Sequence, residues 1–119
     1  MKIAVPTSGK TLESQVDNRF GRASGFVVFN TEDGTFVYAD NSQNLNAAQG
    51  AGTQASQNVA GTGAGVVIAP SYGPNAFKVL NSVGIKTFIS APGTVKENID
   101  NYIAGKLSET DAANVEGHW

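Results

Sequence analysis

Three short apolar segments constrain the fold of this chain more than any other feature. They lie at residues 2–6, 66–70 and 85–90, and each is too short for a buried helix. Proline or glycine bounds each segment, which is typical of strands. Helical patterns separate the second segment from the third and also follow the third. Because helical crossovers join strands that run parallel, the sequence predicts an α/β sheet.

Two further strands are expected from a hairpin between the first and second apolar segments. Residues 25–31 and 35–40 are rich in Phe, Val and Tyr. The dipeptide Asp33-Gly34 between them is typical of a tight turn that joins antiparallel strands. The hairpin adds antiparallel pairing, so the expected sheet is mixed.

Three helices are expected to pack on this sheet. A weak helical pattern covers residues 49–60, and a second helix begins at Pro74 and stops at Gly84. A capping box at residues 94–97 opens the third helix, which ends at Gly105. Their buried faces are expected to consist of apolar or small residues at helical spacing. These are Ala48, Gly52, Ala55 and Val59, then Phe77, Leu80 and Val83, and finally Val95, Ile99, Tyr102 and Ile103.

The predicted order of elements is β-β-β-α-β-α-β-α, a five-stranded mixed sheet with flanking helices. A length of 119 residues suits one α/β domain with one core. We expect this domain to span residues 1–107, because residues 108–119 form a polar C-terminal tail.

Composition excludes several classes of function. The chain has no cysteine, which rules out disulfides, thiolate zinc sites and cysteine-ligated iron–sulfur clusters. Its formal net charge of −2 does not suggest a broad nucleic-acid surface. No segment approaches the roughly 20 apolar residues of a membrane span, and the N-terminal apolar run is too short for a signal peptide. We therefore expect a cytoplasmic protein that binds neither nucleic acid nor membrane.

The two arginines of the chain, Arg19 and Arg22, both lie in the short segment 17–22 after the first strand. The lysines, by contrast, are scattered singly along the sequence. Guanidinium groups stay charged and grip anions in fixed geometry, so this loop predicts an anion site. The alternative is a structural pairing of Asp17 with either arginine that only shapes the loop.

Three segments leave the sheet where the first, third and fourth strands are expected to end, at the edge where open α/β sheets bind ligands. They are residues 8–22, 44–52 and 71–74, and the last two lead into helix starts with partial positive charge. Residues 41–77 contain no charged side chain that would repel an anion. The candidate binding residues are Ser8, Asp17, Arg19, Phe20, Gly21, Arg22, Gly50, Ala51, Gly52, Tyr72 and Gly73. The alternatives are that the glycines only allow tight turns and that Tyr72 is a half-buried tyrosine.

Catalytic motifs are incomplete. Residues 4–11 resemble a phosphate-binding loop, but no convincing helix follows and neither later strand ends in an acidic residue for magnesium. A two-metal nuclease needs several carboxylates, and only Asp17 and Asp40 are expected near the edge. The single histidine, His118, has no nucleophile partner and is either a solvated tail residue or a metal ligand. We therefore expect neither an enzyme nor a nucleotide-binding protein.

Five motifs carry a resemblance to a known family. They are Lys2-Ile3-Ala4-Val5-Pro6, Val16-Asp17-Asn18-Arg19-Phe20-Gly21-Arg22-Ala23, Gly50-Ala51-Gly52, Gly73-Pro74-Asn75-Ala76-Phe77 and Gly105-Lys106-Leu107. Through them the chain resembles the dinitrogenase iron–molybdenum cofactor biosynthesis family of small NifX-like domains. The resemblance implies a ribonuclease H-like fold, and binding or carriage of a molybdenum- and/or iron-containing sulfide cluster or its precursor. It also implies a cofactor-assembly protein as partner. Many relatives end in histidine-rich tails, a pattern from which this chain departs.

Two functions of different classes follow. The first is non-catalytic binding or carriage of an anionic metal–sulfur cluster through the arginine loop and the helix N-termini. The second is a regulatory protein-interaction module that keeps the fold without a cofactor. Because the chain has no cysteine, a cluster would be held by ionic contacts, N–H donors or His118.

Overall fold

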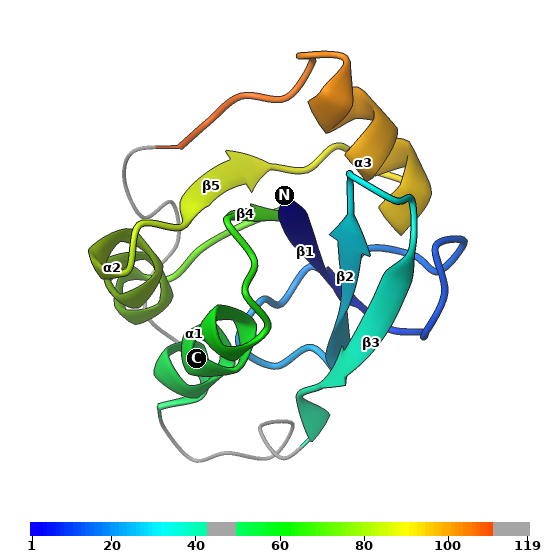
Figure 1. Ribbon diagram of the computed structural model, residues 1–119. Helices are drawn as coiled ribbons and strands as arrows, with labels where there is room; N and C mark the ends of the chain where they lie inside the picture. The colour runs from blue at the N-terminus through cyan, green and yellow to red at the C-terminus, as the bar shows by residue number, and fades with distance from the viewer. Residues whose placement is uncertain (43–49, 111–119) are drawn as a thin grey trace.

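The structure is a computed structural model that describes residues 1–42 and 50–110 of the chain (Figure 1). Its strands are β1 (Lys2–Thr7), β2 (Gly25–Asn30), β3 (Phe36–Asp40), β4 (Val66–Ala69) and β5 (Lys86–Ile89). Its helices are α1 (Ala51–Gly61), α2 (Pro74–Ser82) and α3 (Val95–Ile103). This order confirms the prediction from the sequence.

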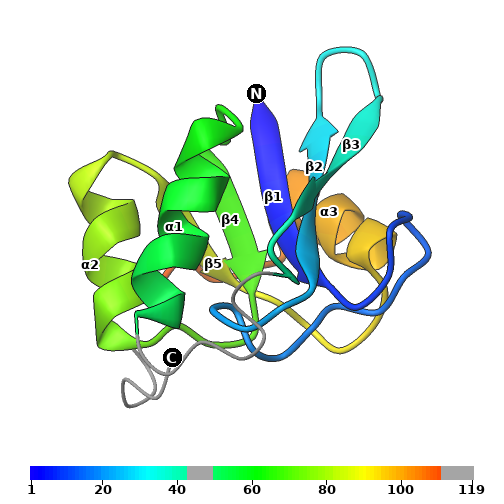
Figure 2. The same ribbon diagram turned by 90° about the horizontal axis from the view of Figure 1, so that it is seen from below.

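The strands form one mixed sheet in the order β3-β2-β1-β4-β5. β4 runs parallel to both β1 and β5, whereas β2 is antiparallel to both β1 and β3. Helices α1 and α2 cover one face of the sheet and α3 covers the other (Figures 1 and 2). All four residues of β4 are buried because both of its faces are covered, which explains its continuous apolar run. The architecture is the predicted ribonuclease H-like α/β fold.

Successive side chains of β1 supply two separate cores. Ala4 packs with Val59 and Leu80 beneath α1 and α2. Its neighbours Ile3 and Val5 point to the opposite face and belong to the core beneath α3. This alternation is the two-residue period of a strand, and it fixes which helix lies on which face.

Two residues predicted to be buried on helix faces are instead exposed. Val83 is 55% exposed and Ile103 is 61% exposed. Val83 is the residue after the end of α2, so it no longer follows the helical spacing, and Ala76 and Leu80 form the buried stripe. Ile103 is the last residue of α3, beyond the turns that bury Val95 and its partners.

Residues 108–110 extend the ordered fold beyond the predicted domain boundary. The N–H of Ile89 donates to the carbonyl oxygen of Ser108 at 3.0 Å, and the N–H of Thr110 donates to that of Thr87 at 2.9 Å. The Thr87 hydroxyl donates to the Thr110 carbonyl oxygen at 3.1 Å. This antiparallel segment pairs with the outer side of β5, which would otherwise be an open sheet edge.

Candidate functional site

The loops that follow β1, β4 and β5 gather at one edge of the sheet, and both α1 and α2 begin there (Figure 2). Parallel pairing of β1, β4 and β5 requires this arrangement, because parallel strands end at the same edge. The sequence predicted contributions after β1, β3 and β4; of the predicted segment 44–52 after β3, residues 44–49 lie outside the described residues. The loop after β5, residues 90–94, is an addition that the structure reveals.

Phe20 anchors the arginine loop to the sheet. Its ring is fully buried, with its centroid 5.3 Å from that of Phe26 in β2 and 5.9 Å from that of Tyr72. Arg19 and Arg22 stand on either side of this anchor in the sequence. Packing of this one ring therefore holds the backbone of the segment that carries both arginines.

Tyr72 also belongs to the core. Its side chain is completely buried, and the single proton of its hydroxyl is shared between the carbonyl oxygens of Phe88 at 2.7 Å and Val67 at 3.1 Å. Burial raises the pKa of the Tyr72 hydroxyl far above its ordinary range. The expectation that the side chains of Phe20 and Tyr72 contact a ligand is at odds with this burial. Both rings fill the space under the loops, so these residues can take part in a site only through their backbone atoms.

A buried asparagine, Asn41, also holds the arginine loop, through hydrogen bonds from its side-chain amide. Asn41, directly after β3, donates from Nδ2 to the carbonyl oxygens of Gly21 at 3.3 Å and Ala23 at 2.9 Å. Its Oδ1 atom accepts a hydrogen bond of 2.7 Å from Asn58 of α1. No pattern in the sequence indicates this role, because an asparagine just after a strand is typical of a turn.

Asp17 shapes the loop locally. Its Oδ1 atom accepts a hydrogen bond of 2.8 Å from the backbone N–H of Arg19 and lies 3.7 Å from Nε of the same residue. The Asp17 side chain is 11% exposed, whereas that of Arg19 is 57% exposed. The contact agrees with the structural alternative for Asp17. Because the pair is long at 3.7 Å and its arginine is largely exposed, it contributes little to stability, and the Arg19 guanidinium remains accessible to a ligand.

Helices α1 and α2 begin without side-chain caps in the part of the chain that the structure describes. Their N-cap residues are Gly50 and Gly73, which have no side chain to accept from the first-turn N–H groups. The single proton of the Ser56 hydroxyl is shared between the carbonyl oxygens of Gly52 at 2.8 Å and Ala76 at 3.2 Å, so this side chain joins the two first turns. By contrast, α3 carries a complete capping box. The uncapped starts present N–H groups and partial positive charge at the edge.

Ser8 lies in the segment that directly follows β1. It is exposed, and its N–H donates to the carbonyl oxygen of Gln15 at 3.4 Å within an excursion that follows β1. This excursion contacts the start of α3, where the N–H of Val95 donates to the carbonyl oxygen of Ser14 at 2.9 Å. The structure therefore places Ser8 with the α3 side of the edge.

The remaining predicted residues divide into three groups. Gly50 is exposed at the start of α1 with a φ of 78°, a conformation that favours glycine. Ala51 and Gly52 are buried in the first turn, where only their backbone groups can meet a ligand. His118 and Ala48 lie outside the described residues.

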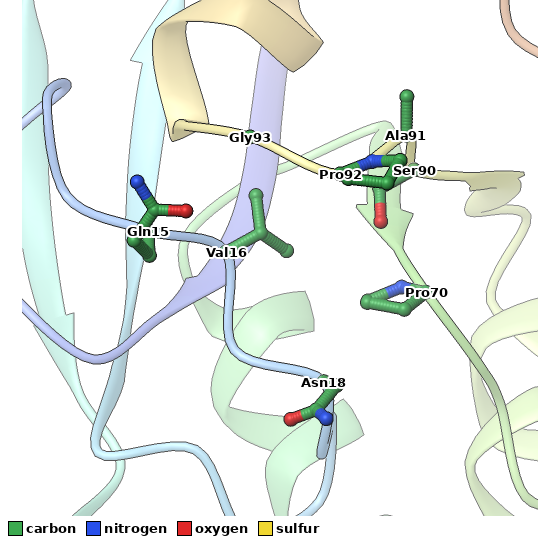
Figure 3. A pocket seen from close by; sticks show the side chains of 8 residues that line it. All are labelled: Gln15, Val16, Asn18, Pro70, Ser90, Ala91, Pro92 and Gly93. Atoms are coloured by element: carbon green, nitrogen blue, oxygen red, sulfur yellow. The ribbon is translucent and has the colours of Figure 1, made fainter.

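A pocket with a volume of about 450 Å³ opens between the loops at this edge (Figure 3). Residues from the β1 loop, the end of β4 and the loop after β5 line it. They are Gln15, Val16, Asn18, Pro70, Ser90, Ala91, Pro92 and Gly93. Sequence reasoning missed residues 90–93 because they carry no charge. Their position after a strand parallel to β1 is the signal that could have found them.

The described residues contain no group of three or more His, Cys, Asp or Glu side chains that could hold a metal ion. A bare cation therefore lacks a ligand set of that kind in the described part of the chain. Among the same residues, no helix combines the length and apolar character needed to cross a membrane.

Together, the sheet and its loops define a small α/β domain whose candidate binding residues lie in loops and helix starts at one edge. The chain belongs to the dinitrogenase iron-molybdenum cofactor family, whose family model matches residues 1–105. This confirms the family that the sequence motifs indicated.

Two solved structures and one curated sequence are similar to this chain over nearly its whole length. The apo form of the orange protein from Desulfovibrio gigas is 36% identical, with a TM-score of 0.93 and 96% of each chain covered. The NMR structure of TM1290 from Thermotoga is 35% identical, with a TM-score of 0.85 and 98% of each chain covered. The uncharacterized protein MJ0580 from Methanocaldococcus jannaschii is 28% identical over 111 residues, which cover 92% of this chain and 91% of that protein.

Proposed function

We propose that this chain binds or carries an anionic metal–sulfur cluster of the molybdenum or iron type, or a precursor of one, as a cytoplasmic and non-catalytic protein. Arg19 and Arg22 supply positive charge, and the N-termini of α1 and α2 supply N–H donors. Since a carrier releases its cargo to another protein, the partner we propose is a cofactor-assembly protein.

One observation carries the proposal, namely that an anchored arginine loop lies at the same edge as two uncapped helix starts. Phe20 and Asn41 fix the loop, and the Ser56 hydroxyl fixes the two helix starts relative to each other. Anions bind favourably at helix N-termini and at guanidinium groups, and charge-assisted hydrogen bonds are the stronger ones. These features support a negatively charged ligand at this edge.

The comparisons support the identity of that ligand. The family is named for the iron–molybdenum cofactor of dinitrogenase, and the similar Desulfovibrio gigas structure is described as an apo form. A metal–sulfur cluster carries its negative charge on sulfide, so it can be held through its surface without cysteine. His118 is the one imidazole of the chain and is proposed as an auxiliary ligand.

The test is a titration of the purified protein with tetrathiomolybdate, alone and with copper or iron, followed by charge-transfer absorbance. We expect saturable binding that is at least tenfold weaker in the double variant Arg19→Ala/Arg22→Ala. The matched control is Lys86→Ala/Lys106→Ala, which removes the same charge from exposed residues outside the arginine loop and should bind like the wild type. Binding that survives high salt in all variants would count against an electrostatic site.

The same titration also tests the alternative function, a protein-interaction module, and the proposed role of His118. Absence of binding by the wild type would reject the proposal and favour the protein-interaction module. A His118→Ala variant that binds as the wild type does would remove the histidine from the ligand set. If the Arg19→Ala/Arg22→Ala variant kept the wild-type affinity for tetrathiomolybdate, the arginine loop would have only a structural role.

A further inference from the structure

The two outer strands of the sheet, β3 and β5, differ in how their free sides are covered. Residues 108–110 pair with the outer side of β5. Within residues 1–42 and 50–110, by contrast, no backbone hydrogen bond reaches the outer side of β3. Figure 1 shows β3 at the rim of the sheet, and Figure 2 shows the β2–β3 turn projecting past α1 and α3. An open strand edge is a template for pairing with another chain.

The pairing of β3 with β2 determines which backbone groups point outward. At the turn, the N–H of Asn30 donates to the carbonyl oxygen of Thr35 at 2.8 Å. Hydrogen-bonded pairs alternate along an antiparallel ladder, so the odd-numbered residues of β3 bond to β2. The N–H and carbonyl groups of Phe36 and Tyr38 therefore point away from the sheet, where they can bond to a further strand.

The side chains along this open edge are apolar. Phe36 is 38% exposed and Val37 is 63% exposed. The ring of Tyr38 occupies the space above Gly25 of β2, so it leans away from the outer side of β3. β3 also lacks the proline, lysine or bulge that commonly protects an open edge, and its one charged residue, Asp40, stands at its end. The edge is therefore suited to pairing.

The charges at the two ends of β3 do not oppose a second copy of the chain. At the turn, Glu32 and Asp33 are balanced by the N-terminal ammonium group, 3.5 Å from Glu32, and by Lys2. At the other end, Asp40 is balanced by nearby Lys10. Antiparallel pairing would bring the turn of one copy beside the Lys10 end of the other. Unlike charges then meet at both ends of the pairing, and neither end carries a net formal charge.

We propose that the outer edge of β3 binds the same edge of a second copy, so that the two sheets join across an antiparallel β3–β3 pair. With Val37 on the two-fold axis, Phe36 of one copy faces Tyr38 of the other, and each such pair exchanges two backbone hydrogen bonds. Aromatic pairs opposite each other on neighbouring strands are stabilising. With Tyr38 on the axis, Phe36 would instead face the carboxylate of Asp40, so we assign the axis to Val37.

The joined sheet would leave both candidate binding edges open, so this inference goes beyond the proposed function and does not depend on it. The end of β3 at Asp40 adjoins the arginine loop, because Asn41 holds that loop. Antiparallel pairing therefore places the two arginine loops at opposite ends of the joined sheet. Pairing through one short strand from each copy buries less than the roughly 1,200–2,000 Å² of stable complexes, so we expect a dimer that forms at high protein concentration.

The first experiment uses the absence of cysteine from the chain. In the proposed register the two Val37 Cα atoms lie about 4.5 Å apart, a separation that a disulfide can bridge. Val37→Cys should form a disulfide-linked dimer under a mild oxidant at least tenfold faster than Tyr38→Cys or Val83→Cys. Val83 is a similarly exposed valine directly after α2. Linkage of Val37→Cys no faster than that of Val83→Cys would overturn the proposal, and faster linkage of Tyr38→Cys would overturn the register.

The second experiment measures reversible association of the full-length chain by light scattering, from about 10 μM to about 1 mM protein. The mass of the wild type should rise from 12.3 kDa toward twice that value. Val37→Lys should stay monomeric, because it places two like charges at the axis, whereas Val83→Lys should associate like the wild type. A wild type that stays monomeric would overturn the proposal and leave the edge to a strand of a different protein. Association of Val37→Lys like that of the wild type would place the dimer contact elsewhere and also overturn it.

The third experiment locates the contact without any substitution. Amide hydrogen exchange of the ¹⁵N-labelled wild type is compared at low and high protein concentration. The amides of Phe36 and Tyr38 should exchange at least tenfold more slowly at high concentration, whereas those of Val37 and Ala39, which bond to β2, should change little. Slowing that spares Phe36 and Tyr38 would overturn pairing through β3.

Discussion

Asn58 of α1 donates a hydrogen bond from its Nδ2 atom to the Oδ1 atom of Asn41 over 2.7 Å. The Nδ2 atom of Asn41 is in turn bonded to the carbonyl oxygens of Gly21 and Ala23. One buried amide therefore connects a helix whose start faces the candidate site with the loop that carries both arginines. The Asn41 side chain therefore fixes the arginine loop and helix α1, the two sources of positive charge, relative to each other.

Asn41→Ala should lower the free energy of unfolding by about 3 kcal/mol, because it leaves several buried backbone and side-chain groups without partners. Asn58→Ala removes a single hydrogen bond from a partly exposed residue and should cost about 1 kcal/mol. Denaturant unfolding of both variants checks this order. Equal losses would show that Asn41 acts only through α1 and not through the arginine loop. Asn41→Ala should also weaken thiomolybdate binding, although both arginines remain.

The burial of Tyr72 predicts that the free energy of unfolding depends on pH in the alkaline range. Its hydroxyl stays protonated in the folded state because burial raises its pKa, whereas in the unfolded chain it ionises near its ordinary pKa of about 10. Above that pH the unfolded state binds fewer protons than the folded state. The contribution of Tyr72 is thus complete below about pH 10 and falls by about 1.4 kcal/mol per pH unit above it.

Comparison with Tyr72→Phe isolates this effect. The variant should be about 1 kcal/mol less stable at pH 8, where the lost hydroxyl only removes hydrogen bonds to Phe88 and Val67. The difference between wild type and variant should shrink between pH 10 and 11. Parallel curves for the two proteins over that range would contradict a buried, protonated hydroxyl.

The architecture could be predicted from the sequence because local signals and topology agree. Asp33-Gly34 encodes the hairpin turn, and Thr94 and Glu97 encode the start of α3. Errors arose at helix ends, where Val83 and Ile103 follow the apolar pattern but lie at or beyond the last helical residue. The spacing of apolar residues predicts which face of a helix is buried. It does not predict at which residue the helix ends or stops packing on the sheet.

The candidate site was predictable only where it depends on charge or glycine. Arg19, Arg22 and the uncapped helix starts were visible in the sequence. Asn41 and Asn98 were not, because the value of a buried asparagine depends on carbonyl groups that only the folded chain brings to it. The placement of Tyr72 in the core was missed for a similar reason, since its hydrogen-bond partners belong to β4 and β5.

The capping box of α3 should matter for stability. Thr94→Ala removes the hydroxyl that accepts from the N–H of Glu97 at 3.1 Å, and it should lower the free energy of unfolding by about 1 kcal/mol. Thr94→Ser keeps the acceptor and should behave like the wild type. The reciprocal bond from the Thr94 N–H lowers the pKa of the Glu97 carboxyl. Its contribution is therefore present above the ordinary glutamate pKa and lost as the pH falls through the lowered pKa of the folded state, which acid unfolding of Glu97→Gln and wild type measures.

Truncation should locate the end of the folded domain. A chain that ends at residue 110 keeps the segment that pairs with β5, and it should unfold with the stability of the full-length chain. A chain that ends at residue 107 loses three hydrogen bonds to Thr87 and Ile89, and it should be less stable by about 2 kcal/mol. It also exposes the edge of β5, so it should aggregate at lower concentration, as light scattering would show. Equal stability of the two truncated chains would mean that residues 108–110 contribute nothing and that the domain ends at residue 107.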